Sequence, residues 1–184
     1  MMIKKIFIIF LLFLFSKANA SNKEQIINDL KKINNLTFEF EQRINKKEEK
    51  GNCTIEYPKK IFCEYYKSNN KILISNGKSL VIKTNNQGSY YRYPLDQTPL
   101  NLILDKEFLI NKIINLDERI VDENYINYTI LENNYEINIF FDKQNFNLVG
   151  WQTLDIYQNF NMTFISNLKK NQKIDQKIFN LPNR

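Results

Sequence analysis

The hydrophobic and polar positions of residues 72–104 predict a hairpin followed by a short apolar helix. Two apolar runs, at residues 72–74 and 80–82, flank Asn76-Gly77, a dipeptide that readily adopts the positive φ angles of a tight turn. Further on, Thr98-Pro99 is typical of a helix start, and no charged residue follows until Asp105. We expect Thr98 to cap this helix, which needs an apolar surface to cover.

The rest of the chain predicts one leading helix and many strands. Residues 21–34 carry an apolar stripe at helical spacing, and residues 36–44 alternate between apolar and polar positions. A second short helix is expected at residues 107–114, and β-rich segments separated by turn signals follow from residue 116. This order is typical of an antiparallel meander.

These elements predict a sheet with few helices to cover it. We expect a mainly antiparallel β protein of the α+β class, an unclosed curved half-barrel of about ten to eleven strands with a short-helix lid. Its concave apolar face needs cover from helices or from a ligand. Two interiors remain open: a hollow one, or one filled by the 14 Phe and 10 Tyr side chains.

The N-terminus has the pattern of a signal peptide. Lys4 and Lys5 precede ten apolar residues at positions 6–15, too few to span a bilayer, and Ala18-Asn19-Ala20 follows. We expect cleavage after Ala20, with residues 1–20 as the signal peptide and residues 21–184 as a single exported domain. The alternative is an uncleaved membrane anchor. The absence of cysteine near the expected cut excludes a lipid-modified N-terminus.

Composition argues against several classes of function. Removing residues 1–20 lowers the formal net charge from +6 to +3, which is too mild to indicate nucleic-acid binding. The chain has no histidine, so it lacks the commonest general base and the usual transition-metal ligand. We expect no enzymatic activity, metal or other cofactor. The alternative is a carboxylate-dependent enzyme, for which Asp96 or Asp105 near the expected lid would be candidates.

The two cysteines are placed to form a cross-strand disulfide. If the chain reverses at Pro58, Cys53 lies opposite Cys63 on the returning strand. An exported protein meets an oxidising environment, which favours the bond. The alternative is a pair of reduced cysteines that pack as small apolar residues.

The order of several short motifs resembles the LolA family of periplasmic carriers of outer-membrane lipoproteins. Residues 36–42 (LTFEFEQ) resemble the family's F-x-x-x-F-x-Q, and residues 74–80 (ISNGKSL) are similar to V-S-D-G-K-x-L-W. Residues 98–100 and their helix resemble T-P-x-x-L-L. The resemblance extends over residues 21–184, with a leading helix and a hairpin at Pro58 in the expected places.

The resemblance implies a periplasmic monomer that holds acyl chains of lipoproteins in an apolar cavity. Such a carrier takes its cargo from an inner-membrane, lipoprotein-releasing ABC transporter and passes it to an outer-membrane acceptor, without chemistry on the cargo. The alternative is a periplasmic lipid-binding or lipoprotein-sensing module of the same fold with a different cargo.

Carried over position by position, the resemblance also implies the site residues. The lid residues are Leu100, Ile103 and Leu104. The cavity residues come from the leading helix and the sheet: Ile26, Leu30, Ile33, Phe38, Phe40, Ile55, Ile61, Cys63, Tyr65 and Leu73. The sequence departs from the family at Tyr57-Pro58, where Arg-Pro is common and the Arg hydrogen-bonds the closed lid. Tyr offers one hydroxyl in place of a fork of donors, so we expect a weaker latch here or one elsewhere.

Overall fold

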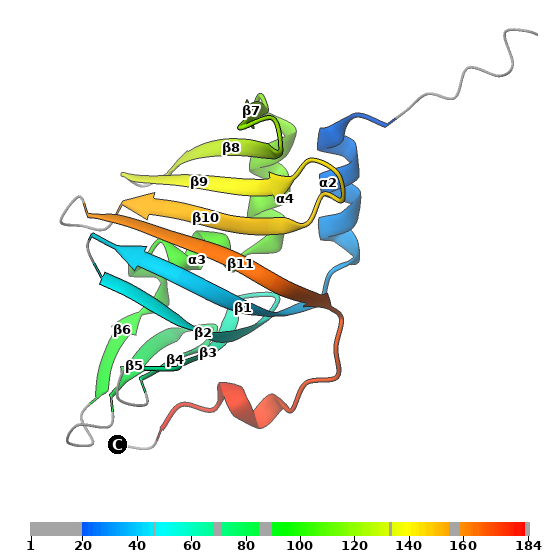
Figure 1. The fold of residues 1–184 in the computed structure, drawn as a ribbon. Coiled ribbons are helices and arrows are strands. Elements are labelled where there is room, and N and C mark those ends of the chain that lie inside the picture. Colours follow the sequence, from blue (N-terminus) through cyan, green and yellow to red (C-terminus); the bar gives the residue numbers. More distant parts are fainter. Residues whose placement is uncertain are drawn as a thin grey trace, which may run out of the picture.

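The computed structural model describes residues 20–45, 47–67, 71–84, 90–132, 134–154 and 159–182. Apart from Ala20, the predicted signal peptide lies outside these ranges. The described chain forms one open, curved, 11-stranded antiparallel sheet with short helices on its concave side (Figure 1). The predicted half-barrel with a helical lid is therefore confirmed.

The strand order explains where the helices lie. The first six strands run consecutively from the centre of the sheet to one edge: β1 (Asn35–Ile44), β2 (Lys47–Glu56), β3 (Lys60–Tyr65), β4 (Ile72–Asn76), β5 (Ser79–Lys83) and β6 (Tyr90–Pro94). The other five begin at the opposite edge and return to the centre: β7 (Arg119–Val121), β8 (Tyr125–Glu132), β9 (Tyr135–Asp142), β10 (Leu148–Leu154) and β11 (Phe160–Lys170). Antiparallel pairing of β1 with β11 joins the two halves. The segment between β6 and β7 must therefore pass from one edge of the sheet to the other.

The alternating pattern of β1 sets the concave face of the sheet. Leu36, Phe38 and Phe40 are buried on this face, while Glu39 between them is exposed. The same parity continues across the neighbouring strands, since Phe38 pairs with Cys53, and Cys53 pairs with Cys63. One apolar surface consequently runs across the central strands, as the sequence pattern predicts.

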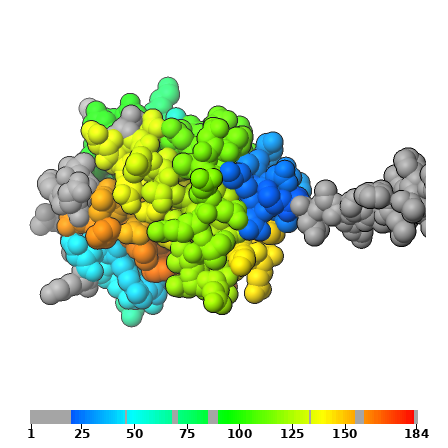
Figure 2. All heavy atoms as spheres, turned by 90° about the horizontal axis from the view of Figure 1, so that it is seen from above, coloured from blue at the N-terminus to red at the C-terminus, as the bar shows by residue number. Residues whose placement is uncertain are grey.

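Two helices cover one end of this surface. α2 (Asn22–Lys32) begins with a capping box in which Ser21 and Glu24 bond each other's backbone N–H groups, and α4 (Lys106–Ile114) begins with Asp105 bonded to the Phe108 N–H. The two helices pack together, with α2 in blue beside the green segment that contains α4 (Figure 2). No helix of the described chain combines the length and apolarity that crossing a membrane requires.

The short apolar helix is present, but its predicted cap is wrong. α3 (Leu100–Ile103) follows a 3-10 turn, η2 (Leu95–Gln97). The Thr98 hydroxyl donates 2.8 Å back to the Leu95 carbonyl, and Pro99 occupies the N-cap position without a side-chain bond. The preceding 3-10 turn thus takes the hydroxyl that would otherwise cap the helix.

A C-terminal segment covers part of the opposite, convex face. η3 (Gln176–Phe179) contacts β3 and β4, and its Phe179 side chain is only 3% exposed. Ile74 and Val81, a cross-strand pair, are also buried but point away from the concave core. Phe179 is therefore buried on the convex side of the sheet.

Candidate functional site

A cavity of about 270 Å³ lies between the concave face of the sheet and α3. Leu100 and Ile103 of α3 form its cover together with Pro99, and Trp151 of β10 contributes to the opposite wall. The remaining apolar walls come from β1, β3, β4 and β5: Phe40, Ile44, Ile61, Leu73, Leu80 and Ile82. Such a site can bind hydrocarbon but offers few groups for chemistry.

The structure brings together about half of the residues expected at the site. Of the expected sheet positions, five line the cavity: Phe40, Ile61, Cys63, Tyr65 and Leu73. Two of the three expected lid residues, Leu100 and Ile103, lie on it as well. These side chains come from β1, β3, β4 and α3, elements spread over residues 35–103 of the sequence.

The other expected residues lie in the packed core and do not line the cavity. Ile26 and Leu30 belong to α2, and Ile33 is the residue at its C-terminal cap. Together with Phe38 and Ile55 they are at most 5% exposed within the concave core. Leu104 follows α3, is completely buried, and is likewise absent from the cavity wall.

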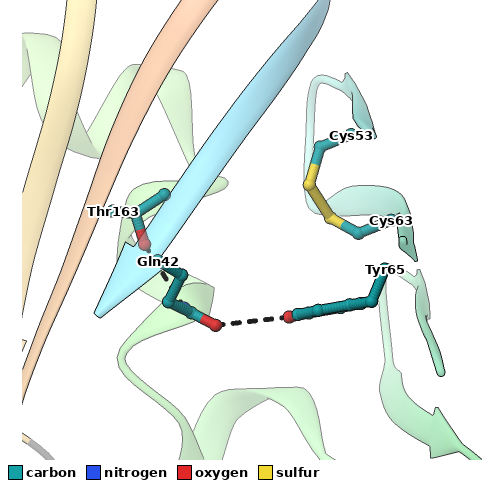
Figure 3. The surroundings of a disulfide bond; sticks show 5 residues. All are labelled: Gln42, Cys53, Cys63, Tyr65 and Thr163. Atoms are coloured by element: carbon teal, nitrogen blue, oxygen red, sulfur yellow. Dashed lines mark hydrogen bonds between the residues drawn. A yellow bond between two sulfur atoms is a disulfide. The ribbon is translucent and has the colours of Figure 1, made fainter. Parts of the chain in front are cut away.

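A disulfide forms part of the cavity wall. Cys53 of β2 and Cys63 of β3 are directly paired in register and bonded through their sulfurs, with their Cα atoms 4.1 Å apart (Figure 3). Both residues face the concave side and line the cavity. The bond therefore ties together two neighbouring strands of this wall.

A row of polar side chains crosses the cavity near the disulfide. Gln42 reaches from β1 toward β3, where the Tyr65 hydroxyl donates to its Oε1 at 3.4 Å (Figure 3). The Gln42 amide donates to Asn161 Oδ1 at 3.0 Å and to Thr163 Oγ1 at 3.3 Å. Asn161 and Thr163 belong to β11, so this network links both halves of the sheet.

A buried ion pair adjoins the same end of the cavity. Glu49 of β2 is 4% exposed, and its carboxylate lies 2.6 Å from Lys71 Nζ and 2.7 Å from Lys47 Nζ. The Lys71 ammonium also lies 4.0 Å from the centre of the Tyr65 ring. Burial, followed by the nearby Glu49 charge, raises the pKa of the Tyr65 hydroxyl far above its usual range, so this hydroxyl stays neutral.

The cover is held by the hairpin between β2 and β3. The backbone N–H of Lys59 donates to the Leu104 carbonyl at 2.8 Å, and Lys59 Nζ lies 3.3 Å from the Asp105 carboxylate. Tyr57 packs against the concave core, and burial raises the pKa of its hydroxyl far above the usual range. The hairpin therefore contacts the lid segment through Lys59, two residues beyond the position where the family commonly has Arg.

Sequence reasoning missed the polar part of the cavity. Gln42 and Ile44 could have been found, because they continue the period of two that places Phe40 on the concave face. Leu80 and Ile82 follow the same parity on β5. No local signal marks Lys71, Trp151, Thr153, Asn161 or Thr163, whose position depends on the pairing of strands distant in the sequence.

An open antiparallel sheet, helices across its concave face and an apolar cavity beneath them define the half-barrel class of binding proteins. The chain belongs to the LolA family. The family model described as "Outer membrane lipoprotein carrier protein LolA" matches residues 31–182. No curated protein matches the chain.

Solved structures share this fold at low sequence identity. An uncharacterized conserved protein from Thermus thermophilus is similar over 88% of this chain and 95% of its own, with 10% identity and a TM-score of 0.53. The LolA superfamily protein NE2245 from Nitrosomonas europaea is similar over 88% and 99% respectively, with 9% identity and a TM-score of 0.46. At such identities the likeness concerns the fold alone.

Proposed function

We propose that this protein is a periplasmic carrier that holds the acyl chains of lipoproteins in the cavity beneath α3. In this proposal, residues 1–20 are a signal peptide, and the single domain of residues 21–184 moves cargo from an inner-membrane ABC transporter toward the outer membrane. The observation that carries the proposal is the apolar cavity with Leu100 and Ile103 as its cover. Each methylene group that it removes from water contributes about 0.8 kcal/mol to binding.

The lid limits both the size and the affinity of the cargo. The cavity of about 270 Å³ is small beside the roughly 300–1,000 Å³ that is typical of ligand pockets, so cargo with several acyl chains must displace α3. Displacement exposes Leu100 and Ile103 to water unless the cargo replaces their contacts. This cost lowers the net affinity and favours release to an acceptor.

A charged lid residue tests the proposal. Leu100→Glu places a carboxylate against the cavity, whereas Leu131→Glu makes the same change on β8 at a side chain that is 71% exposed. We expect the Leu100 variant to bind a synthetic triacylated cysteinyl peptide at least tenfold more weakly, since a buried charge is costly. The Leu131 variant should bind as the wild type does. Calorimetric titration measures both, and unchanged binding by L100E would contradict the lid assignment.

A second candidate is a periplasmic lipid-binding or lipoprotein-sensing module with a different cargo. The polar side chains Gln42, Asn161 and Thr163 in the cavity wall support it, because they can also hydrogen-bond to the polar groups of a lipid other than a lipoprotein. Native mass spectrometry of protein isolated without detergent separates the two. Bound triacylated peptide supports the carrier, a bound glycolipid supports the second candidate, and lipid-free protein in repeated preparations argues against both.

A further inference from the structure

Four polar side chains form a patch on the cavity wall, which we call the carbonyl patch: Gln42, Thr153, Asn161 and Thr163. They lie on three adjacent strands, β1, β11 and β10. Gln42 is paired in register with Thr163, and Asn161 is paired with Thr153. Strand pairing therefore gathers these residues at one end of the sheet, where β1 and β10 end and β11 begins.

Some hydrogen-bond donors of the carbonyl patch are not used within the patch. The side-chain amide of Gln42 donates hydrogen bonds to Asn161 Oδ1 and Thr163 Oγ1. Among the described residues, neither the Asn161 NH₂ group nor the Thr163 hydroxyl donates to another group. Both of these donors remain available to a ligand in the cavity.

Thr153 gives the clearest indication of a ligand. Its side chain is 4% exposed and lines the cavity, yet its hydroxyl forms no hydrogen bond with any described residue. No fully enclosed side-chain oxygen or nitrogen of the described chain lacks a partner, so this hydroxyl is not sealed off from the cavity space. When a ligand displaces water from an apolar cavity, such a hydroxyl needs a hydrogen-bond acceptor on the ligand to remain satisfied.

The chemistry of that acceptor follows from the surroundings. The carbonyl patch contains no charged side chain, and the nearby Lys71 ammonium is already paired with Glu49. Uncharged donors in such a place match an uncharged acceptor without a proton of its own, such as a carbonyl oxygen. An alkyl chain in contact with the patch would instead leave these donors unsatisfied.

We propose that the carbonyl patch binds the ester or amide carbonyl oxygens that link acyl chains to the polar part of the cargo. The hydrocarbon chains then lie along Phe40, Trp151 and the lid residue Ile103, which line the rest of the cavity. This orientation places the polar part of the cargo at the end of the sheet away from α2 (Figure 1). The inference rests on the proposed lipid-binding function and specifies the linkage that is recognised.

Two lipids that differ only in their carbonyl groups test this assignment. Dioctanoylglycerol has two ester carbonyls, and its diether analogue, dioctylglycerol, has none. We expect wild-type protein to bind the ester about tenfold more tightly, the effect of one or two hydrogen bonds in an apolar site. Displacement of a fluorescent fatty acid from the protein comprising residues 21–184 measures both affinities.

A near-isosteric variant assigns the difference to the patch. Thr153→Val removes the hydroxyl and keeps the shape, so we expect about a fivefold loss of ester affinity and unchanged ether affinity. Thr54→Val is the control, because Thr54 lies on β2 between Cys53 and Ile55 and faces the convex side. It should bind both lipids as wild type, and thermal unfolding of each variant checks that the fold is kept.

The outcomes separate this inference from the proposed function. Equal wild-type affinity for the two lipids, or an equal loss for both in T153V, would overturn the carbonyl assignment and leave apolar binding in the cavity intact. Failure of wild-type protein to bind either lipid would contradict the proposed function itself. A loss confined to the ester supports the assignment.

Discussion

Gly51 shows how a single residue shapes the cavity wall. It lies on the concave side of β2, between Phe40 of β1 and Tyr65 of β3 in the register. The rings of Phe40 and Tyr65 meet edge to face above it, with centroids 5.0 Å apart. A Cβ atom at this position would lie 1.9 Å from the Glu64 carbonyl oxygen and 2.8 Å from the Phe40 ring. Glycine therefore permits the contact between two cavity-lining rings.

We expect Gly51→Ala to lower the free energy of unfolding by about 2–4 kcal/mol, because backbone atoms must move to admit the methyl group. Gly77→Ala is the matched control. Gly77 has a φ of +94° but open space around it, with the nearest atom 3.9 Å away, so backbone strain of about 1 kcal/mol is the main cost. Urea denaturation measures both, and a G51A cost no larger than that of G77A would contradict the steric account.

Asp105 combines two roles at the end of the lid segment. Its carboxylate accepts from the Phe108 N–H at 3.1 Å, which caps α4, and it pairs with Lys59 at 3.3 Å. The cap contributes about 1 kcal/mol and the partly exposed ion pair less than about 1 kcal/mol. The cap is consequently the larger of the two contributions.

Three variants separate these roles in urea denaturation. Asp105→Ala removes both interactions, and we expect a loss of about 1–2 kcal/mol in the free energy of unfolding. Asp105→Asn keeps an oxygen that can cap the helix, so it should resemble Lys59→Ala, with a loss below about 1 kcal/mol. An Asn variant as unstable as the Ala variant would instead assign most of the stabilisation to the charge.

Residue-level expectations succeeded where they followed from local parity or register. The cross-strand position of Cys53 and Cys63 could be predicted because a short hairpin fixes which residues meet. The role of Thr98 could not, since the competing carbonyl of Leu95 belongs to a 3-10 turn with no clear sequence pattern. The hydroxyl of Thr153 faces the cavity only because β10 pairs with β11 in one particular register.

At the scale of elements, the position of the lid is set by the connection between β6 and β7. The chain leaves β6 at one edge of the sheet and enters β7 at the other, so the segment that contains α3 and α4 must cross the concave face. The apolar helix predicted from the sequence is thereby placed over the apolar face of the strands. The lid is anchored at one end where the Leu95 N–H donates to the Lys78 carbonyl, and at the other by Lys59.

Two leucines at the ends of α3 should respond differently to truncation. Leu104 is completely buried outside the cavity, so Leu104→Ala leaves a new void, and we expect a loss of about 3–4 kcal/mol in the free energy of unfolding. Leu100 is partly exposed and already borders the cavity, so Leu100→Ala should cost less than about 1.5 kcal/mol. Urea denaturation compares the two. Equal losses would mean that Leu100 packs as a core residue and does not form a movable cover.

The helix α2 and the strand β1 could be predicted because the periodic pattern of apolar residues continues over ten or eleven residues in each. The 3.6-residue stripe of α2 and the alternation of β1 both appear where expected. The division of the apolar residues between packed core and cavity was not predictable. Ile26 and Leu30 satisfy the same pattern whether they face a void or other side chains, and only the packing of α2 on α4 decides between the two.

At the scale of the whole molecule, the two faces of the sheet are closed by different parts of the chain. Helices cover the concave face, while η3 contacts β3 and β4 from the convex side. Gln176 joins this segment to the β2–β3 hairpin by hydrogen bonds with Glu56 and Lys60. Lys60 Nζ also lies 5.6 Å from the centre of the Phe179 ring. The C-terminal segment is thus tied to the hairpin that carries the contacts with the lid.

This attachment should weaken in acid. Partial burial acts to raise the pKa of Glu56, but hydrogen bonds from Gln176 and Lys60 outweigh it and hold the pKa below its ordinary value of 4.5. A lowered pKa in the folded state stabilises the fold above the unfolded value, and the stabilisation is lost as the pH falls through the folded value. We therefore expect the stabilisation that Glu56 contributes to this attachment to be lost progressively as the pH falls below 4.5.

Substitution of Glu56 checks the acid response. The difference in free energy of unfolding between wild type and Glu56→Gln should be present at pH 7 and should shrink as the pH falls below 4.5, with urea denaturation at each pH as the measurement. Glu64→Gln on β3 is the control, since that exposed carboxylate makes no hydrogen bond or ion pair among the described residues. A difference between wild type and E56Q that stays constant over this range would contradict the assignment.

The overall architecture could be inferred because the balance of many strands and few helices admits few solutions. The size of the cavity could not, because it depends on how far α3 stands from the sheet. The position of the C-terminal segment on the convex face could not be inferred either, because the sequence around Phe179 does not indicate which face of the sheet it covers.

The disulfide between Cys53 and Cys63 gives the two sides of the cavity unequal mechanical stiffness. A covalent bond and a continuous ladder of hydrogen bonds resist separation of β2 from β3. The cover opposite is the four-residue helix α3, and its flanking residues are held only by non-covalent contacts, from Lys78 and Tyr135 before the helix and from Lys59 after it. When a larger ligand binds, the β2–β3 wall would stay in place and α3 would move outward. The length of acyl chain that the cavity accepts would then depend on how far α3 can move away from the sheet.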